Sequence, residues 1–152
     1  MGKLFVLGMD LGTTTGVCKL FYDDSIETLI TKHKPDLKER VCGVAGIIES
    51  HSSKECIGVC IEEPFSGQFS SVKALFPMIG AVVLECENQG LPWSFIHLSK
   101  LKAHATGKGN AKKHEMQEAA FQRWGQRLTE DEADACFAAA YAMDTGLFTN
   151  GL

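Results

Sequence analysis

The sequence predicts one α/β domain, residues 1–152, in which a mixed five-stranded sheet carries helices on both faces. A chain of 152 residues with 45% hydrophobic content can bury one proper core but is too short for two. Three strand-like segments separated by turns come first, and helical and strand-like segments then alternate. This order is typical of a mixed sheet that is covered by helices on both sides.

The predicted strands are short apolar runs bounded by turn residues. The first strand, Lys3 to Met9, is followed by the turn-forming segment Asp10-Leu11-Gly12-Thr13-Thr14-Thr15-Gly16, which leads into the second. These two strands therefore form a hairpin with an acid at its edge. The five predicted strands span residues 3–9, 17–22, 26–31, 57–61 and 93–97.

The predicted helices have apolar residues at a spacing close to 3.6. Pro35 opens the first helix, whose apolar positions are Leu37, Val41, Val44, Ile47 and Ile48. A long helix is expected from about Ser70 to Asn88, and two more span residues 111–127 and 130–145. Thr129 and Glu132 form a capping box at the start of the last helix.

The charges are segregated along the chain. The formal net charge of -4, taken as one uniform charge, argues against nucleic-acid binding, yet the segment from Asn88 to His114 contains no acidic residue. Five lysines fall within it: Lys100, Lys102, Lys108, Lys112 and Lys113. Such segregation can produce one electropositive face on an acidic protein, although an ordinary solvated lysine surface would have the same sequence.

Signals for a membrane or secreted protein are missing from the sequence. No stretch approaches the roughly 18 uninterrupted apolar residues of a membrane span, and Met1-Gly2-Lys3 leads into a strand-like segment rather than a signal peptide. We therefore expect a cytoplasmic protein. The six cysteines form no CxxC pair and no cluster with zinc spacing, so we expect them to be reduced, buried and structural.

Four acids occupy chain positions from which they can converge. Asp10 follows the first strand, Glu62 follows the fourth, and Asp131 and Asp134 lie three residues apart on one face of the last helix. Hydrolysis of a phosphodiester requires an activated water, a stabilised leaving oxygen and neutralised charge, which a pair of divalent ions supplies. Because carboxylates this close repel one another, a bound cation would keep them all ionised.

Each acid also has a purely structural explanation. Asp10 can shape a turn, and Glu62 can be an exposed strand end. Acids at a helix N-terminus are favourable, which explains Glu130 and Glu132. This does not explain Asp134, which precedes an apolar run and therefore needs a partner such as a metal ion.

Four segments, taken in order, resemble the successive motifs of the RuvC Holliday-junction resolvases, a family with an RNase H-like fold. They are Leu7-Gly8-Met9-Asp10-Leu11-Gly12-Thr13-Thr14-Thr15-Gly16, Cys60-Ile61-Glu62-Glu63-Pro64-Phe65, Thr106-Gly107-Lys108-Gly109-Asn110-Ala111-Lys112-Lys113 and Asp131-Glu132-Ala133-Asp134-Ala135. The resemblance spans nearly the whole chain. It implies a metal-dependent endodeoxyribonuclease that resolves four-way DNA junctions by paired symmetric nicks and leaves 5′-phosphates. The short length and negative charge are more similar to the bacteriophage branch of the family.

The resemblance also implies roles for individual residues. The catalytic and metal-binding acids would be Asp10, Glu62, Asp131 and Asp134, holding two Mg²⁺ ions for which Mn²⁺ can substitute. Basic residues that meet the DNA backbone are matched by Lys102 and Lys113, and the phosphate contacts are predicted to include Lys108 and Lys112. Phe65 matches an aromatic that inserts against bases near the crossover. A homodimer is implied as well, with much of its contact on the helix at 70–88.

Other interpretations stay open at this point. Glu63-Pro64 departs from the residues that usually follow the second acid in bacterial members, which leaves the role of Glu63 undecided. Asp10-Leu11-Gly12-Thr13-Thr14 also resembles the first phosphate loop of the actin, Hsp70 and sugar-kinase superfamily, although the sequence has no second such loop. A catalytically inactive DNA-binding or scaffold protein would not need all four acids. A nuclease of the same fold that cuts RNA–DNA hybrids or other branched substrates is not distinguished by sequence.

Overall fold

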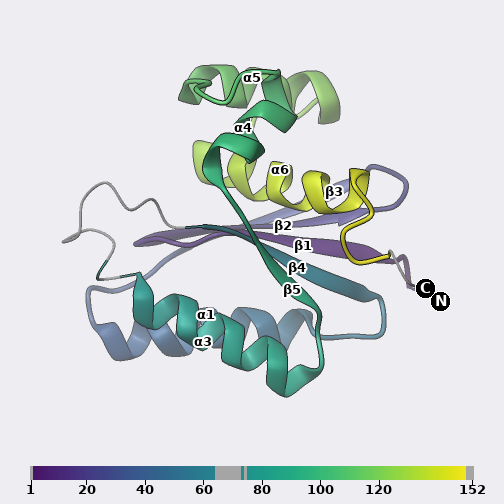
Figure 1. Ribbon diagram of the computed structural model, residues 1–152. Helices are drawn as coiled ribbons and strands as arrows, with labels where there is room; N and C mark the ends of the chain where they lie inside the picture. The colour runs from purple at the N-terminus through teal and green to yellow at the C-terminus, as the bar shows by residue number, and fades with distance from the viewer. Residues whose placement is uncertain (1, 64–72, 74, 150–152) are drawn as a thin grey trace.

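The computed structural model describes residues 2–63, 73 and 75–149. The elements follow in the order β1 (Phe5–Asp10), β2 (Thr14–Phe21), β3 (Ile26–Lys32), α1 (Leu37–His51), β4 (Cys56–Glu62), α3 (Phe76–Gln89), β5 (Trp93–Ile96), α4 (Leu98–Thr106), α5 (Lys113–Trp124) and α6 (Glu130–Asp144). The strands form one sheet in the order β3-β2-β1-β4-β5, which lies between two helical layers (Figure 1).

The strand directions follow from the connections between the strands. β1, β2 and β3 pair antiparallel because short turns join them, whereas β4 and β5 extend the sheet in parallel because a helix precedes each of them. The predicted mixed five-stranded sheet with helices on both faces is therefore confirmed. Because β1 and β4 are parallel neighbours, their C-terminal ends lie side by side at one edge of the sheet.

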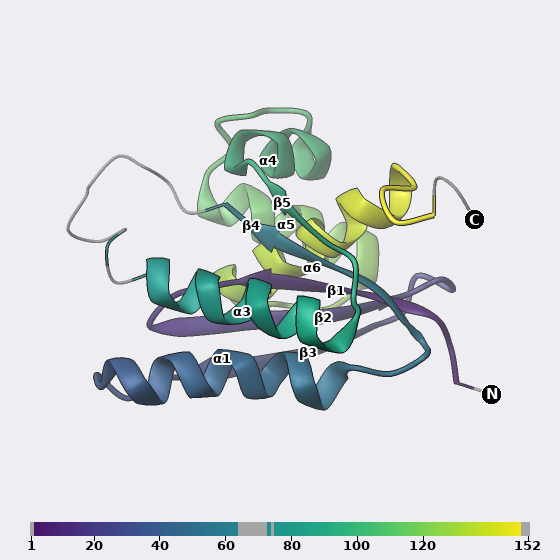
Figure 2. The ribbon, with the colours of Figure 1, turned by 60° about the horizontal axis from the view of Figure 1, so that its bottom comes forward.

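Successive residues of β1 point into two different cores, as the period of two in a strand requires. Leu7 and Met9 face the layer of α1 and α3, where they pack with Ile48 and Val82. Val6 faces the opposite layer, which is built from α4, α5 and α6. In that layer α6 lies directly on the sheet, with α4 and α5 on its outer side (Figure 1). Figure 2 brings the layer of α1 and α3 forward.

Helix α6 approaches the sheet very closely. A Cβ atom added to Gly8 of β1 would lie 1.9 Å from the carbonyl oxygen of Ala135, and one added to Gly16 of β2 would lie 2.3 Å from that of Asp131. The helix contributes mainly small buried side chains: Ala133, Ala135, Ala138, Ala139, Ala140 and Ala142. Glycine in the strands and alanine in the helix together set the height of α6 above the sheet.

The predicted helices differ from the observed ones mainly at their ends. α1 begins at Leu37 because the Asp36 carboxylate accepts a hydrogen bond from the Lys38 backbone N–H and caps the helix. α5 ends at Trp124, before the predicted end, because Gly125 adopts a left-handed conformation with a φ of 67°. In the helix predicted for 70–88, residues 70–72 and 74 lie outside the described residues, and α3 begins at Phe76.

Helix α4 is not among the predicted elements. The His97 side chain caps its start by accepting from the Ser99 backbone N–H, and Gly107, with a φ of 83°, ends it. Both boundaries use ordinary helix signals. The helix between them has only 9 residues, however, which are too few to display a clear apolar period.

The cysteines are free thiols, as expected, and five of them are buried. Cys42 of α1 is exposed, so the expectation that all six are buried is wrong at this position. Within the described ranges, no helix has the length and apolarity needed to cross a membrane.

Candidate active site at the edge of the sheet

Two of the predicted acids lie on adjacent strand ends. Asp10 is the last residue of β1 and Glu62 the last of β4, and the preceding residues Met9 and Ile61 are direct partners across the two strands. Met9 and Ile61 both point into the core beneath α1 and α3. Because side chains alternate along a strand, Asp10 and Glu62 point to the other face, where α6 lies.

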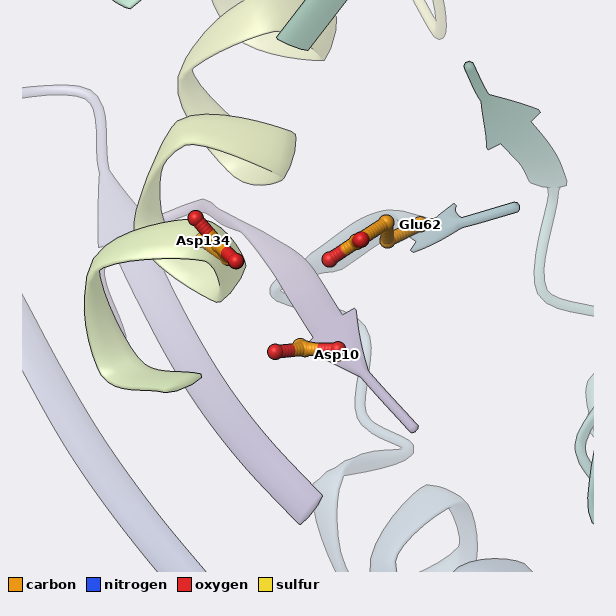
Figure 3. A group of neighbouring side chains, drawn as sticks. All are labelled: Asp10, Glu62 and Asp134. Atoms are coloured by element: carbon orange, nitrogen blue, oxygen red, sulfur yellow. The ribbon is translucent and has the colours of Figure 1, made fainter. Parts of the chain in front are cut away.

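Helix α6 supplies the third carboxylate. Asp134 lies in the early part of this helix and is only 8% exposed. Asp10, Glu62 and Asp134 each contribute one carboxylate oxygen to a group whose three oxygens lie within 4.8 Å of one another. Figure 3 shows the three side chains converging from β1, β4 and α6. The structure therefore brings together three of the four predicted acids, from segments far apart in the sequence.

Asp131 lies beside this group but is not a member of it. It raises the pKa of Asp10 by hydrogen bonding and by charge repulsion, so the two carboxyls are neighbours. Its neighbour Glu132 points elsewhere, as expected: the Thr28 hydroxyl donates to the Glu132 carboxylate, which also accepts from the Thr129 backbone N–H at 3.0 Å. The predicted capping box is thus present, and it accounts for Glu132 without accounting for Asp134.

The pKa of every carboxyl in the group is raised, mainly by burial. Burial and the nearby charges of Glu62 and Asp134 raise the pKa of Asp10 to about 11. Burial, followed by repulsion from Glu62, raises the pKa of Asp134 to about 8, and burial raises the pKa of Glu62 as well. Lys102 acts in the opposite direction on both Glu62 and Asp134. A group of acids that is this unfavourable when ionised gains most from a bound cation.

The residues present fit a divalent cation. Glu62 Oε2 and Asp134 Oδ1 are buried and have no hydrogen-bond partner among the described residues, so a ligand would satisfy both. The group of three contains carboxylates alone, without histidine or cysteine. An all-oxygen ligand set suits hard cations such as Mg²⁺ and Mn²⁺ rather than zinc.

We expect the metal-free protein to lose stability as the pH rises from about 4 to 8. Because the folded state raises the pKa of Asp134 to about 8, it keeps a proton that the unfolded chain has already released. The free energy of unfolding should then fall by up to about 1.4 kcal/mol per pH unit for each such proton. Mg²⁺ binds the ionised group, so it should raise the melting temperature more at pH 8 than at pH 5. Melting curves in EDTA and in Mg²⁺ measure this; an equal increment at every pH would contradict it.

The predicted DNA-binding lysines lie on or between α4 and α5. Lys102 is half-buried on α4, where its charge reaches the acidic group, and Lys113 begins α5. Lys108 and Lys112 lie in the connection between the two helices. Two of the four are ion-paired: Lys108 with Glu115 at 3.5 Å, and Lys113 with Glu130 at 3.1 Å. Phe65, the predicted base-contacting aromatic, lies outside the described residues.

Two glycines that the sequence motifs contain have a positioning role that the motifs did not indicate. Gly16 is the direct partner of Asp10 across β1 and β2, and it leaves room for the backbone of Asp131. Gly8 does the same for Ala135, the residue after Asp134. A glycine inside a strand often marks a close backbone approach, and this was the available signal.

Neither protein-family models nor curated protein sequences match the chain. Solved structures do share its fold, among them the following two. Thermus thermophilus RuvC aligns with a TM-score of 0.76 at 23% identity, covering 94% of this chain and 97% of that chain. T. thermophilus RuvC in complex with a Holliday junction substrate aligns with a TM-score of 0.75 at 23% identity, covering 94% of this chain and 96% of that chain. The chain therefore has the fold of RuvC, an RNase H-like α/β fold, with the acids Asp10, Glu62 and Asp134 gathered at one edge of its sheet.

Proposed function

We propose that the protein is a metal-dependent, structure-selective endodeoxyribonuclease that resolves four-way DNA junctions by paired symmetric nicks. The observation that carries the proposal is the convergence of Asp10, Glu62 and Asp134, two of which present buried oxygens without a partner. The similarity in fold to a RuvC that is described in complex with a Holliday junction substrate supports the choice of DNA. The phosphate-loop alternative gains no such support, because Asp10 lies among carboxylates.

In this proposal the acids hold two Mg²⁺ or Mn²⁺ ions, with Asp131 joining the group of three. When bound, the ions supply an activated water and neutralise charge on the phosphate. The protein's own contribution is positioning. Asp10 and Glu62 are held at the ends of paired strands, and Asp134 is held by the close packing of α6 on the sheet. Lys102 adds a positive charge beside the group, which favours the approach of a phosphate.

The DNA would extend from this edge over α4 and α5. We assign phosphate contacts to Lys102, Lys108, Lys112 and Lys113. Phe65 follows Glu62, the last residue of β4, by three positions in the sequence. We therefore propose that Phe65 stacks on unpaired bases near the crossover, as the sequence resemblance implies.

A junction has two symmetric strands to cut, so we propose a homodimer with two active sites. Helix α3 offers the apolar side chains that such a contact needs, because Phe76 is 51% and Leu84 62% exposed. We expect Leu84→Glu to shift the protein from dimer to monomer in sedimentation velocity. Leu37→Glu, at an exposed leucine of α1, is the matched control and should remain dimeric. A parent protein that sediments as a monomer would contradict the dimer itself.

The proposed function is tested by a cleavage assay with labelled four-way junction, flap, linear duplex and RNA–DNA hybrid. We expect the junction to be cut preferentially, in the presence of Mg²⁺ or Mn²⁺ and not in EDTA. The nicked products should be sealed by DNA ligase, which requires 5′-phosphate ends. Preferential cutting of the hybrid would indicate a ribonuclease of the same fold instead, and full activity in EDTA would contradict the metal-dependent mechanism.

A further inference from the structure

One of the predicted phosphate-binding lysines is already occupied by a carboxylate of the same chain. The Lys113 ammonium lies 3.1 Å from the Glu130 carboxylate, although the Lys113 side chain is 78% exposed. Lys113 is the first residue of α5 and Glu130 the first of α6, so the ion pair joins the starts of these two helices. Among the described residues, Lys113 makes no other ion pair.

The pair stands next to the acidic group. Glu130 directly precedes Asp131, and its charge reaches Glu62 and Asp134, whose pKa values it helps to raise. The N-terminus of α6 already carries Asp131 and Glu132 in the same turn. An uncompensated Glu130 would therefore add to a strongly negative part of the surface, close to the place where a DNA phosphate must enter.

We propose that Glu130 competes with the DNA backbone for Lys113 and thereby limits the affinity of the protein for DNA. The inference rests on the proposed function. Carboxylate and phosphate oxygens offer a lysine ammonium the same kind of charge-assisted bond. An exposed ion pair is weak, so a phosphate can displace Glu130. Each DNA molecule that engages Lys113 must then break the pair and leave Glu130 unneutralised beside it.

The competition sets a cost that every DNA engaging Lys113 must exceed. DNA that contacts the protein through few phosphates gains little binding free energy to offset the cost of breaking the Lys113–Glu130 ion pair. A branched substrate that also occupies the acidic site and the neighbouring lysines gains more, because its contacts add to one another. Removing the Glu130 charge should accordingly help linear duplex at least as much as four-way junction.

The experiment is a double-mutant cycle on DNA binding in EDTA, where no cutting occurs. Fluorescence anisotropy at low salt compares the parent, Glu130→Gln, Lys113→Ala and the double variant, with circular dichroism melting curves to check the fold of each. We expect Glu130→Gln to bind duplex roughly threefold more tightly, the change that corresponds to one exposed ion pair. In the Lys113→Ala background the gain should be clearly smaller, because no ion pair has to be broken and only the direct repulsion between Glu130 and phosphate remains. The gain should also shrink as salt is added, because the competing attraction is screened.

Glu118→Gln is the matched control, since Glu118 is an exposed acid of α5 that accepts from Gln122 at 2.9 Å and makes no ion pair among the described residues. An equal gain in affinity from Glu118→Gln would mean that the effect comes from the net charge of the protein, and it would overturn the inference. An undiminished gain in the Lys113→Ala background would also overturn it, because Glu130 would then act by direct repulsion alone, without competing for Lys113. Failure of the parent to bind any DNA would overturn the proposed function, whereas DNA binding without the expected coupling would overturn the competition alone.

Discussion

Asp134→Asn should cut four-way junctions more than about 100-fold more slowly than the parent, since residues that merely orient a metal ligand already contribute roughly 10–100-fold. An amide has nearly the shape of the carboxyl but is a neutral and weaker ligand for Mg²⁺. Asp134 is buried, one of its oxygens has no hydrogen-bond partner among the described residues, and its carboxylate belongs to the group formed with Asp10 and Glu62. Nicking assays with saturating junction and varied Mg²⁺ measure the loss.

The same variant should bind junctions in EDTA at least as tightly as the parent. The pKa of Asp134 is about 8, so in the metal-free parent this carboxyl is mostly neutral at pH 7, like an amide. Above pH 8 the parent gains a negative charge that the variant lacks, and the variant should then bind DNA more tightly. Gel-shift assays at pH 7 and pH 9 test this. Loss of binding together with a lowered melting temperature would instead indicate a folding defect.

Glu132→Gln is the matched control for this prediction. Glu132 lies two residues away on the same helix, and glutamine retains the capping box with Thr129. Its side chain contacts Thr28 rather than the acidic group, so cutting should remain close to normal. Near-normal cutting by Asp134→Asn would remove Asp134 from the site. A comparable loss in both variants would mean that the general charge of the helix N-terminus matters, rather than a specific ligand.

Gly8→Ala should destabilise the protein by about 3 kcal/mol or more, the upper end of the usual cost of overpacking a core. The added Cβ would lie 1.9 Å from the carbonyl oxygen of Ala135 and 2.8 Å from the backbone nitrogen of Ala139. These are backbone atoms of a helix, which cannot turn aside as a flexible side chain can. The helix must therefore rise from the sheet, and we expect the melting temperature to fall by roughly 6–12 °C.

Gly46→Ala makes the same chemical change but is expected to stabilise the protein rather than destabilise it. Gly46 lies within α1, and a Cβ there would have no atom within 4 Å. Alanine is the better helix former, so this variant should gain about 1 kcal/mol. Thermal or urea unfolding of the two variants measures the difference. If Gly8→Ala unfolds like the parent, the close approach of α6 to β1 is not what holds the helix in place.

The strand-borne acids could be predicted from sequence because their positions follow from local patterns. Asp10 and Glu62 each follow an apolar run, and the ends of parallel strands meet at one edge of a sheet. Asp134 could be predicted because an acid entering an apolar helix needs a partner. Asp131 shares its helical face, yet it lies outside the group within 4.8 Å. Helical spacing gives the direction of a side chain, whereas its distance from the strand ends depends on how closely the helix packs.

The remaining features depend on contacts that no local pattern records. Helix α4 is too short to show a period, and its half-buried Lys102 reaches the acids only because α4 packs on α6. The ion pair between Lys113 and Glu130 joins two separate helices, so the local sequence around Lys113 does not indicate it. From sequence alone the predicted DNA-binding lysines can form an electropositive face or an ordinary solvated surface, and among the described residues two of the four are paired with a neighbouring glutamate.

The order of the chain also determines when the candidate site can exist during protein synthesis. Asp10 and Glu62 lie on strands that are synthesised before α6, the last of the described helices, which carries Asp134 and covers Gly8 and Gly16 of the sheet. Domains generally begin to fold from the N-terminus while the ribosome is still at work. A nascent chain whose α6 is still inside the ribosome has neither the third carboxylate nor the packing that would hold it. In the proposed nuclease, the site could therefore not assemble before α6 has left the ribosome.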